Sequence, residues 1–451
     1  MPTATEAFQA GLGHQEKHDY DQAIRAFSEA ITLNPRFAEA YYGRGNAYEA
    51  KGQYDTAIHD YSAVLRFSPR EATAYYNRGL TYSKIGQRAE AIADYDEALR
   101  LDPDCGKAHY NRGLACFKMG QFEQAIGDFT EAIRLDPKDA DAYVSRGLTY
   151  ALQGEPDRAI AEYDEAIHVN PQHAKAYGNR GNAYERRGEY EKAIADYSEV
   201  IRLNPQDARA YCNRAVTCLH LNRLDEAIAD YTEAIRLNPK NAKAFCTRGI
   251  AHAKKRQFDN ALADYNEAVR LDPKNGDAYV CRGQAKAAKG DRQGAIADYN
   301  EAIELNPQCV KAYDGRGTIH GMNGDLDRAI ADFTHVIQLD AGDAKAYCHR
   351  GVVHARNNQW DQAIADYSEA IRLRPDFAMA YYNRGLVYGI QGDCDRGIAD
   401  LTQTIRLLPE LARAYHNRAV IYERQGKKAL AQADQAKAQE LPPYSSVTSL
   451  S

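Results

Sequence analysis

The chain has 451 residues, of which 44% are hydrophobic and 27% are charged, and its formal net charge at pH 7 is -6. This composition is too apolar for an intrinsically disordered chain, and its acidic balance argues against a general nucleic-acid-binding protein, whose charge is usually basic. No apolar run approaches the roughly 18 residues that span a bilayer, so we expect no membrane insertion. The nine cysteines form no C-x-x-C pair and no secretory signal is visible in Met1–Gly13, so we expect a cytoplasmic protein.

Prolines recur at a constant interval along nearly the whole chain. From Pro35 to Pro307 a proline stands every 34 residues, Ala341 takes the next place, and the series resumes at Pro375. This period predicts one continuous array of repeats rather than separate globular domains. The thirteen predicted repeats cover 4–37, 38–71, 72–105, 106–139, 140–173, 174–207, 208–241, 242–275, 276–309, 310–343, 344–377, 378–411 and 412–445. Residues 1–3 are then an N-terminal extension and residues 446–451 a disordered tail.

Each repeat has the pattern of two helices joined by a tight turn. In residues 72–105 large and small apolar residues recur at helical spacing in each half, with Tyr75 and Tyr82 on one face of the first helix. Gly86 lies between the halves, where a left-handed glycine ends a helix, and Pro103 ends the second helix. A hairpin of this size cannot bury its apolar face alone, so we expect neighbouring hairpins to stack.

The repeat resembles the tetratricopeptide repeat, whose pattern has aromatic, glycine, alanine, aromatic and proline residues at fixed positions. In residues 72–105 the matching residues are Tyr75, Gly79, Ala91, Tyr95 and Pro103. The resemblance covers essentially the whole chain. It implies an all-α, right-handed superhelical solenoid of antiparallel helix hairpins, an α-α superhelix, and a role in protein–protein interaction. The recurrent glycine, opposite an equally recurrent alanine, indicates close contact between the two helices.

A second regularity joins the two helices of each repeat. From the second repeat onward the seventh position is always arginine and the twenty-third is always acidic, as in Arg78 with Asp94 and Arg180 with Asp196. The first repeat lacks both residues. In an antiparallel hairpin these two positions lie opposite each other on the two helices. The pattern therefore predicts a structural ion pair between them. The alternative is an arginine ladder that binds phosphate or carboxylate, although the matching acids argue against it.

Histidine and cysteine patterns do not indicate a catalytic or metal site. His14 and His18 have helical spacing but no evident third ligand, and His252, His320 and His354 share one position in separate repeats. Equivalent positions on packed helices lie about 8–10 Å apart, whereas zinc ligands must all lie about 2 Å from one ion. The repeat accounts for nearly every residue, so we expect no enzyme, no cofactor and no metal.

The tetratricopeptide resemblance implies that the first helix of each repeat lines a concave groove. Basic residues outnumber acidic ones at the groove positions, tyrosine occupies the fifth position of four repeats, and asparagine recurs at the sixth. We expect a peptide-binding groove formed by Tyr42, Asn46, Tyr76, Asn77, Lys84, Lys107, Tyr110, Asn111, Lys118, Asn179, Asn182, Asn213 and Lys243. Alternatively, these tyrosines pack against neighbouring first helices and expose little of their rings.

The favoured function is a non-catalytic scaffold that binds extended or helical peptide segments. We place its principal site in repeats two to four and expect a ligand with acidic or C-terminal carboxylate character. One alternative is a substrate-recognition arm or adaptor for a separate enzyme such as a glycosyltransferase, whose repeat arms resemble this asparagine pattern. Another is a co-chaperone that holds chaperone tails, but Tyr42 stands where that clamp needs lysine. A structural spacer is a third. The partners expected are proteins or peptides, with no nucleic acid, and the chain is expected to be monomeric.

Overall fold

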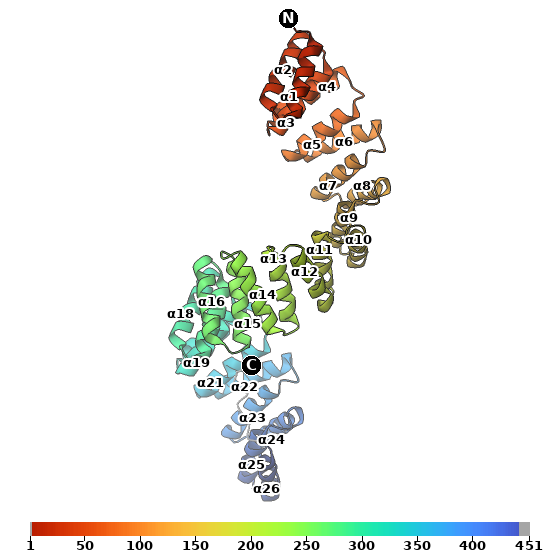
Figure 1. The fold of residues 1–451 in the computed structure, drawn as a ribbon. Helices are drawn as coiled ribbons and strands as arrows, with labels where there is room; N and C mark the ends of the chain where they lie inside the picture. The colour runs from red at the N-terminus through yellow and green to blue at the C-terminus, as the bar shows by residue number, and fades with distance from the viewer. Residues whose placement is uncertain (1, 442–451) are drawn as a thin grey trace. The chain divides into compact units, whose positions relative to one another are not determined.

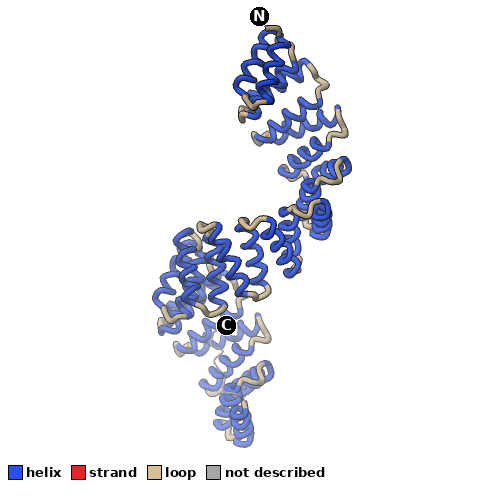
Figure 2. The backbone as a smooth tube through the Cα atoms, viewed as in Figure 1, coloured by secondary structure: helices blue, strands red, loops and turns tan. Residues whose placement is uncertain are grey.

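The computed structural model describes residues 2–441, and all regular secondary structure in that range is helical (Figures 1 and 2). The chain forms two compact units, residues 1–223 and 224–451, which are described separately. The expectations for Met1, for the last residues of the final repeat and for the tail 446–451 lie outside the described residues. The prediction of an all-α fold is confirmed.

Within each unit, helices adjacent in the chain pack against each other. The first unit contains α1 (Ala4–Glu16), α2 (Tyr20–Leu33), α3 (Ala38–Ala50), α4 (Tyr54–Phe67), α5 (Ala72–Lys84), α6 (Arg88–Leu101), α7 (Gly106–Lys118), α8 (Phe122–Leu135), α9 (Ala140–Leu152), α10 (Pro156–Val169), α11 (Ala174–Arg186), α12 (Tyr190–Leu203) and α13 (Ala208–His220). The second unit contains α14 (Leu224–Leu237), α15 (Ala242–Lys254), α16 (Phe258–Leu271), α17 (Gly276–Ala288), α18 (Arg292–Leu305), α19 (Val310–Asn323), α20 (Leu326–Leu339), α21 (Ala344–Arg356), α22 (Trp360–Leu373), α23 (Ala378–Gln391), α24 (Cys394–Leu407), α25 (Ala412–Arg424) and α26 (Lys428–Glu440).

The third repeat shows why the chain folds into hairpins. Helix α5 ends at Lys84, and Gly86 adopts a left-handed φ of 84° that reverses the chain. The backbone N–H of Gln87 donates to the carbonyl of Tyr82 at 3.0 Å, which satisfies the last turn of α5. Helix α6 then starts at Arg88 and ends before Pro103, where the sequence predicted its end.

Packing follows the same rule along each unit. The two helices of a repeat pack together, and the second helix packs on the first helix of the next repeat, as α4 does on α5. Successive first helices also touch, as α5 and α7 do. We call the surface formed by α1, α3, α5, α7, α9, α11 and α13 the first-helix face of the first unit. It corresponds to the groove surface expected from the sequence.

The recurrent glycine of the first helix makes room for an aromatic ring. A Cβ atom on Gly79 would lie 2.9 Å from Cε1 of Tyr95, and Tyr95 is fully buried. The expected approach to Ala91 is present through its backbone oxygen, at 3.3 Å from that Cβ position, but the ring is the closer neighbour. The glycine therefore serves mainly to seat the aromatic side chain of the second helix.

The arginine at the seventh position joins three helices. In the third repeat, Nε and Nη2 of Arg78 donate to the two carboxylate oxygens of Asp94, each at 2.7 Å. Its Nη1 donates at 2.9 Å to Oγ of Ser62, on the second helix of the preceding repeat. Because both edges of the guanidinium are used, Arg78 is not available as a rung of a ligand-binding arginine ladder.

The same intra-repeat pair recurs along both units. It joins Arg44 to Asp60, Arg112 to Asp128, Arg146 to Glu162, Arg180 to Asp196, Arg248 to Asp264, Arg282 to Asp298, Arg316 to Asp332, Arg350 to Asp366, Arg384 to Asp400 and Arg418 to Asp434. The inter-repeat partner was not foreseen from the sequence. It could have been found, because the twenty-fifth position is always Ser, Thr, Asp or Asn in repeats one to twelve.

Candidate functional site

Three tyrosines predicted to line the groove occupy the first-helix face. Tyr42, Tyr76 and Tyr110 lie on α3, α5 and α7 and are half-buried. Each ring packs against an aromatic ring of its own repeat, with centroids 6.0, 6.1 and 5.8 Å apart. Burial raises the pKa of all three hydroxyls. Part of each ring therefore belongs to the core, and the remainder faces the surface.

The asparagines of the next repeat hold two of these tyrosines, Tyr42 and Tyr76, whereas the Tyr110 hydroxyl lies 3.5 Å from Oγ of Ser145. Nδ2 of Asn77 donates to the Tyr42 hydroxyl at 2.7 Å, and Nδ2 of Asn111 donates to the Tyr76 hydroxyl at 3.1 Å. A corresponding bond of 2.8 Å joins Asn417 to Tyr382 in the second unit. The predicted tyrosine and asparagine rows are thus joined by hydrogen bonds where both residues are present in successive repeats, at Tyr42 and Tyr76 in the first unit and at Tyr382 in the second. The amide nitrogens of Asn77, Asn111 and Asn417 are therefore already engaged.

Asn46 belongs to a polar cluster within the same face. The Tyr61 hydroxyl lies 2.8 Å from Oδ1 of Asn46 and 2.9 Å from Oε2 of Glu49, so two oxygens compete for its one proton. Nζ of Lys84 lies 2.7 Å from Oε1 of Glu49. Lys84, which the sequence predicted as part of the peptide-binding groove, is therefore paired with a carboxylate. An equivalent cluster joins Tyr197, Asn182 and Glu185.

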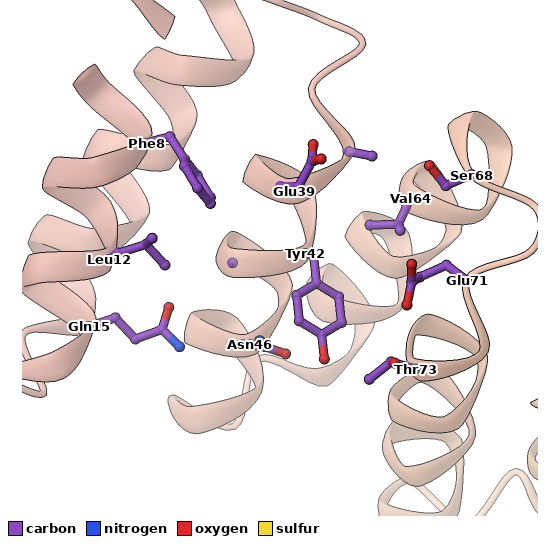
Figure 3. Close-up of a pocket in the computed structure, with 12 residues that line it drawn as sticks. Phe8, Leu12, Gln15, Glu39, Tyr42, Asn46, Val64, Ser68, Glu71 and Thr73 are labelled. Carbon is purple, nitrogen blue, oxygen red and sulfur yellow. The ribbon is translucent and has the colours of Figure 1, made fainter. Parts of the chain in front are cut away.

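A hollow of ≈ 400 Å³ opens at the beginning of the first-helix face (Figure 3). Phe8 and Leu12 of α1, Tyr42 of α3 and Val64 of α4 supply its apolar lining. The polar lining comes from Gln15, Glu39, Asn46, Ser68, Glu71 and Thr73. Of these residues, the sequence predicted Tyr42 and Asn46 as part of the peptide-binding groove. Phe8 could have been found, because it occupies the same repeat position as Tyr42.

A second hollow, also of ≈ 400 Å³, lies where the fifth position lacks a side chain. Gly178 occupies that position on α11, and a Cβ there would meet only Val200, at 3.7 Å. Three predicted residues, Asn179, Asn182 and Asn213, share the lining of this hollow with the exposed Lys175 and Arg209. The structure thus brings the three asparagines together around a space left by one glycine.

The remaining predicted lysines are exposed. Lys107 and Lys118 lie near the two ends of α7 in the first unit, and Lys243 lies at the start of α15 in the second unit. Neither Lys107 nor Lys118 forms a salt bridge within residues 2–441. They are therefore the cations that this stretch of the first-helix face offers to a ligand.

Cysteines and other potential metal ligands form no group of three in the part of the chain that the structure describes. Cys246 and Cys348, at the fifth position of their repeats, are buried. Within the described part of the chain, no three His, Cys, Asp or Glu side chains gather closely enough to hold a metal ion. None of the helices in residues 2–441 has the length and apolarity of a membrane span.

Comparison with known families identifies the repeat. A family model described as tetratricopeptide repeat matches residues 76–140, 117–174, 153–208, 179–242 and 282–344. A model described as TPR repeat matches residues 16–52, 45–86 and 355–392, and two further tetratricopeptide repeat models match residues 242–275 and 412–444. No curated protein matches the chain.

Solved structures of repeat proteins are also similar to parts of the chain. The crystal structure of MamA is 32% identical, covering 37% of this chain and 96% of that one, with a TM-score of 0.35. YrrB, described as a TPR protein with an unusual peptide-binding site, is 26% identical, with 41% and 95% covered and a TM-score of 0.38. A tetratricopeptide repeat protein from Parabacteroides merdae is 20% identical, with 55% and 98% covered and a TM-score of 0.45. Family models match repeats in both units, and the chain belongs to the tetratricopeptide repeat family.

Proposed function

We propose that this chain is a non-catalytic scaffold that binds an extended or helical peptide segment on the first-helix face of its first unit. Its family supports a role in protein interaction. The observation that carries the finer proposal is the row of Tyr42, Tyr76 and Tyr110 on three successive first helices, which we call the strip, with Tyr42 lining a hollow of ≈ 400 Å³. Partly exposed aromatic rings on rigid helices are common anchors of protein interfaces.

The hydrogen bonds within the strip favour peptide binding. Because Asn77 and Asn111 fix the Tyr42 and Tyr76 hydroxyls, the rings lose little further freedom when a ligand stacks on them. The strip also repeats from one helix to the next, so it suits a ligand that is itself elongated. The exposed Lys107 adds a cation beside it.

A second binding position for an acidic or C-terminal carboxylate segment is supported by the hollow at Gly178. Asn179, Asn182 and Asn213 offer amide groups there, and Lys175 and Arg209 offer positive charge. Asp207 also lines the hollow, but one of its carboxylate oxygens accepts from the backbone N–H groups of Arg209 and Ala210. The amide and cationic donors attract a carboxylate. We therefore assign the acidic segment expected from the sequence to this hollow, rather than to repeats two to four alone.

A triple Tyr42→Ala, Tyr76→Ala and Tyr110→Ala variant tests the proposal. The probe is a set of peptides selected on the unmodified chain from a displayed library of random twelve-residue sequences. We expect the variant to keep its helicity by circular dichroism and to bind these peptides at least about tenfold more weakly, because hot-spot residues contribute about 2 kcal/mol or more each. A double Lys243→Ala and Lys345→Ala variant is the comparison. Undiminished binding by the tyrosine variant, with loss in the lysine variant, would refute this placement.

A further inference from the structure

The hollow at the start of the first-helix face differs in charge from the rest of the strip. The carboxylates of Glu39 and Glu71 border it, and both side chains are exposed. Neither carboxylate has a salt-bridge partner within residues 2–441, whereas Glu49 nearby is paired with Lys84. The hollow therefore presents uncompensated negative charge.

The hollow also has an apolar lining of suitable size. Its ≈ 400 Å³ lies within the range of about 300–1,000 Å³ that is usual for small-ligand pockets. Figure 3 shows Phe8 and Leu12 on one side of Tyr42 and Val64 on the other. A large aliphatic or aromatic side chain placed there would be removed from water by carbon atoms on two sides.

The polar side of the hollow carries an unmatched acceptor and negative charge. Oε1 of Gln15 is buried and has no hydrogen-bond partner in the described part of the chain. It is an acceptor, and an unmatched buried acceptor is costly unless a ligand supplies a donor. In addition, the charge of Glu71 acts on the Tyr42 hydroxyl: burial is the main cause of its raised pKa, and Glu71 adds to it.

From this apolar lining and its uncompensated carboxylates, we infer that the hollow receives a large apolar side chain of a peptide that carries Lys or Arg at an adjacent position. This inference rests on the proposed peptide-binding function and specifies the ligand. The ammonium or guanidinium group lies at Glu39 and Glu71, and its N–H donors face acceptors rather than other donors.

The charges on the next repeats specify the order of basic and acidic residues along the bound peptide. Lys107 and Lys118, on α7, carry positive charge without salt-bridge partners among the described residues. A peptide that runs along the face therefore meets the carboxylates of Glu39, on α3, and Glu71, just before α5, and then the lysines of α7. Its basic and apolar residues occupy the hollow, and any acidic residues lie toward α7.

The test uses the full chain and the displayed twelve-residue library described above. We expect the selected sequences to be enriched in Phe, Leu or Met next to Lys or Arg. One selected peptide is then labelled with fluorescein, and its affinity is measured by fluorescence anisotropy. Its Lys or Arg→Gln version should bind about three- to tenfold more weakly, because exposed ion pairs contribute modestly.

Two variants of the chain locate the binding. Thr73→Trp places a large ring at the hollow and should weaken binding at least about tenfold, whereas Met379→Trp, at the same repeat position in the second unit, should not. A double Glu39→Gln and Glu71→Gln variant should weaken binding about three- to tenfold and remove the preference for the basic residue. Asp277→Asn, again at the position of Glu39, is its matched control.

The outcomes separate this inference from the proposed function. If no peptide is selected, both fail. If selected peptides bind but lack a basic residue, or if Thr73→Trp and the double glutamine variant bind them normally, the hollow does not hold this ligand while peptide binding stands. If Thr73→Trp loses helicity, the double glutamine variant decides alone, because both glutamates are exposed and their loss leaves the core unchanged.

Discussion

Replacing Arg78 by leucine should expose how strongly the arginine joins its three helices. Arg78 makes two hydrogen bonds of 2.7 Å to Asp94 and one of 2.9 Å to Ser62. The Asp94 side chain is 7% exposed, so water cannot replace the guanidinium. Arg78→Leu therefore leaves a buried carboxylate without a counter-charge.

The expected loss can be estimated from these contacts. Removing one partner of a buried ion pair costs about 3–5 kcal/mol, and the lost bond to Ser62 adds about 1 kcal/mol. The double variant Arg78→Leu with Asp94→Leu loses the bond to Ser62 but leaves no stranded charge. Because buried ion pairs are often replaced by apolar residues at little cost, we expect the double variant to lose about 1 kcal/mol or less.

The pH dependence provides a further check. Burial raises the pKa of Asp94, and Arg78 opposes this effect, so removing Arg78 raises that pKa further. In the unfolded chain the pKa of an aspartate is about 3.9. If the pKa is higher in the folded state, stability falls as the pH rises from the unfolded pKa to the folded one, and the loss stays complete at higher pH. The penalty of Arg78→Leu should therefore be full at pH 7 and should shrink as pH falls toward 4. The double variant should not show this recovery.

Hydrogen exchange measured by mass spectrometry is the suitable assay, because long repeat arrays open locally rather than in one two-state step. The free energy of opening is read for α5 and α6 in the unmodified chain, the single variant and the double variant. Equal losses in the two variants, or a loss in the single variant that does not depend on pH, would refute the reasoning.

Two smaller changes test the packing of the hairpins by the same exchange measurement. In Gly79→Ala the new Cβ would lie 2.9 Å from the Tyr95 ring, and this overpacking should cost about 1–3 kcal/mol of local stability. The higher helix propensity of alanine offsets roughly 1 kcal/mol of that loss. Gly127→Ala is the control, because Gly127 lies within α8 and a Cβ there would have no neighbour within 4 Å. This change should stabilise α8 by about 1 kcal/mol. Equal effects at Gly79 and Gly127 would contradict the packing of Gly79 against Tyr95. Tyr76→Phe removes the acceptor of Asn111 and should cost about 0.5–1.5 kcal/mol, so unaltered exchange in α5 and α7 would argue against that bond.

Local features of the sequence predicted the hairpins well. Gly86 and Pro103 end helices by backbone geometry, which depends on the residue itself and its immediate neighbours. The pairing of Arg78 with Asp94 was also accessible, because the same two positions vary together between repeats of one chain. Both predictions concern features within a single repeat. The spacing of residues along its two short helices already determines which residues lie opposite each other.

Contacts between repeats were decided by the tertiary structure. The bonds from Arg78 to Ser62 and from Asn77 to Tyr42, and the neutralisation of Lys84, each join side chains of successive repeats. Their distances depend on how one hairpin rotates and shifts against the next and on which rotamers then fit. A repeat period specifies neither quantity.

The candidate site shows the same division. The sequence by itself determined that Tyr42 and Asn46 lie on a first helix, and it indicated a peptide-binding surface. The hollow and its acidic border form only when Phe8 of the first repeat and Glu71 at the end of the second are brought beside Tyr42. The packing of three successive hairpins creates that space, and no single repeat contains it.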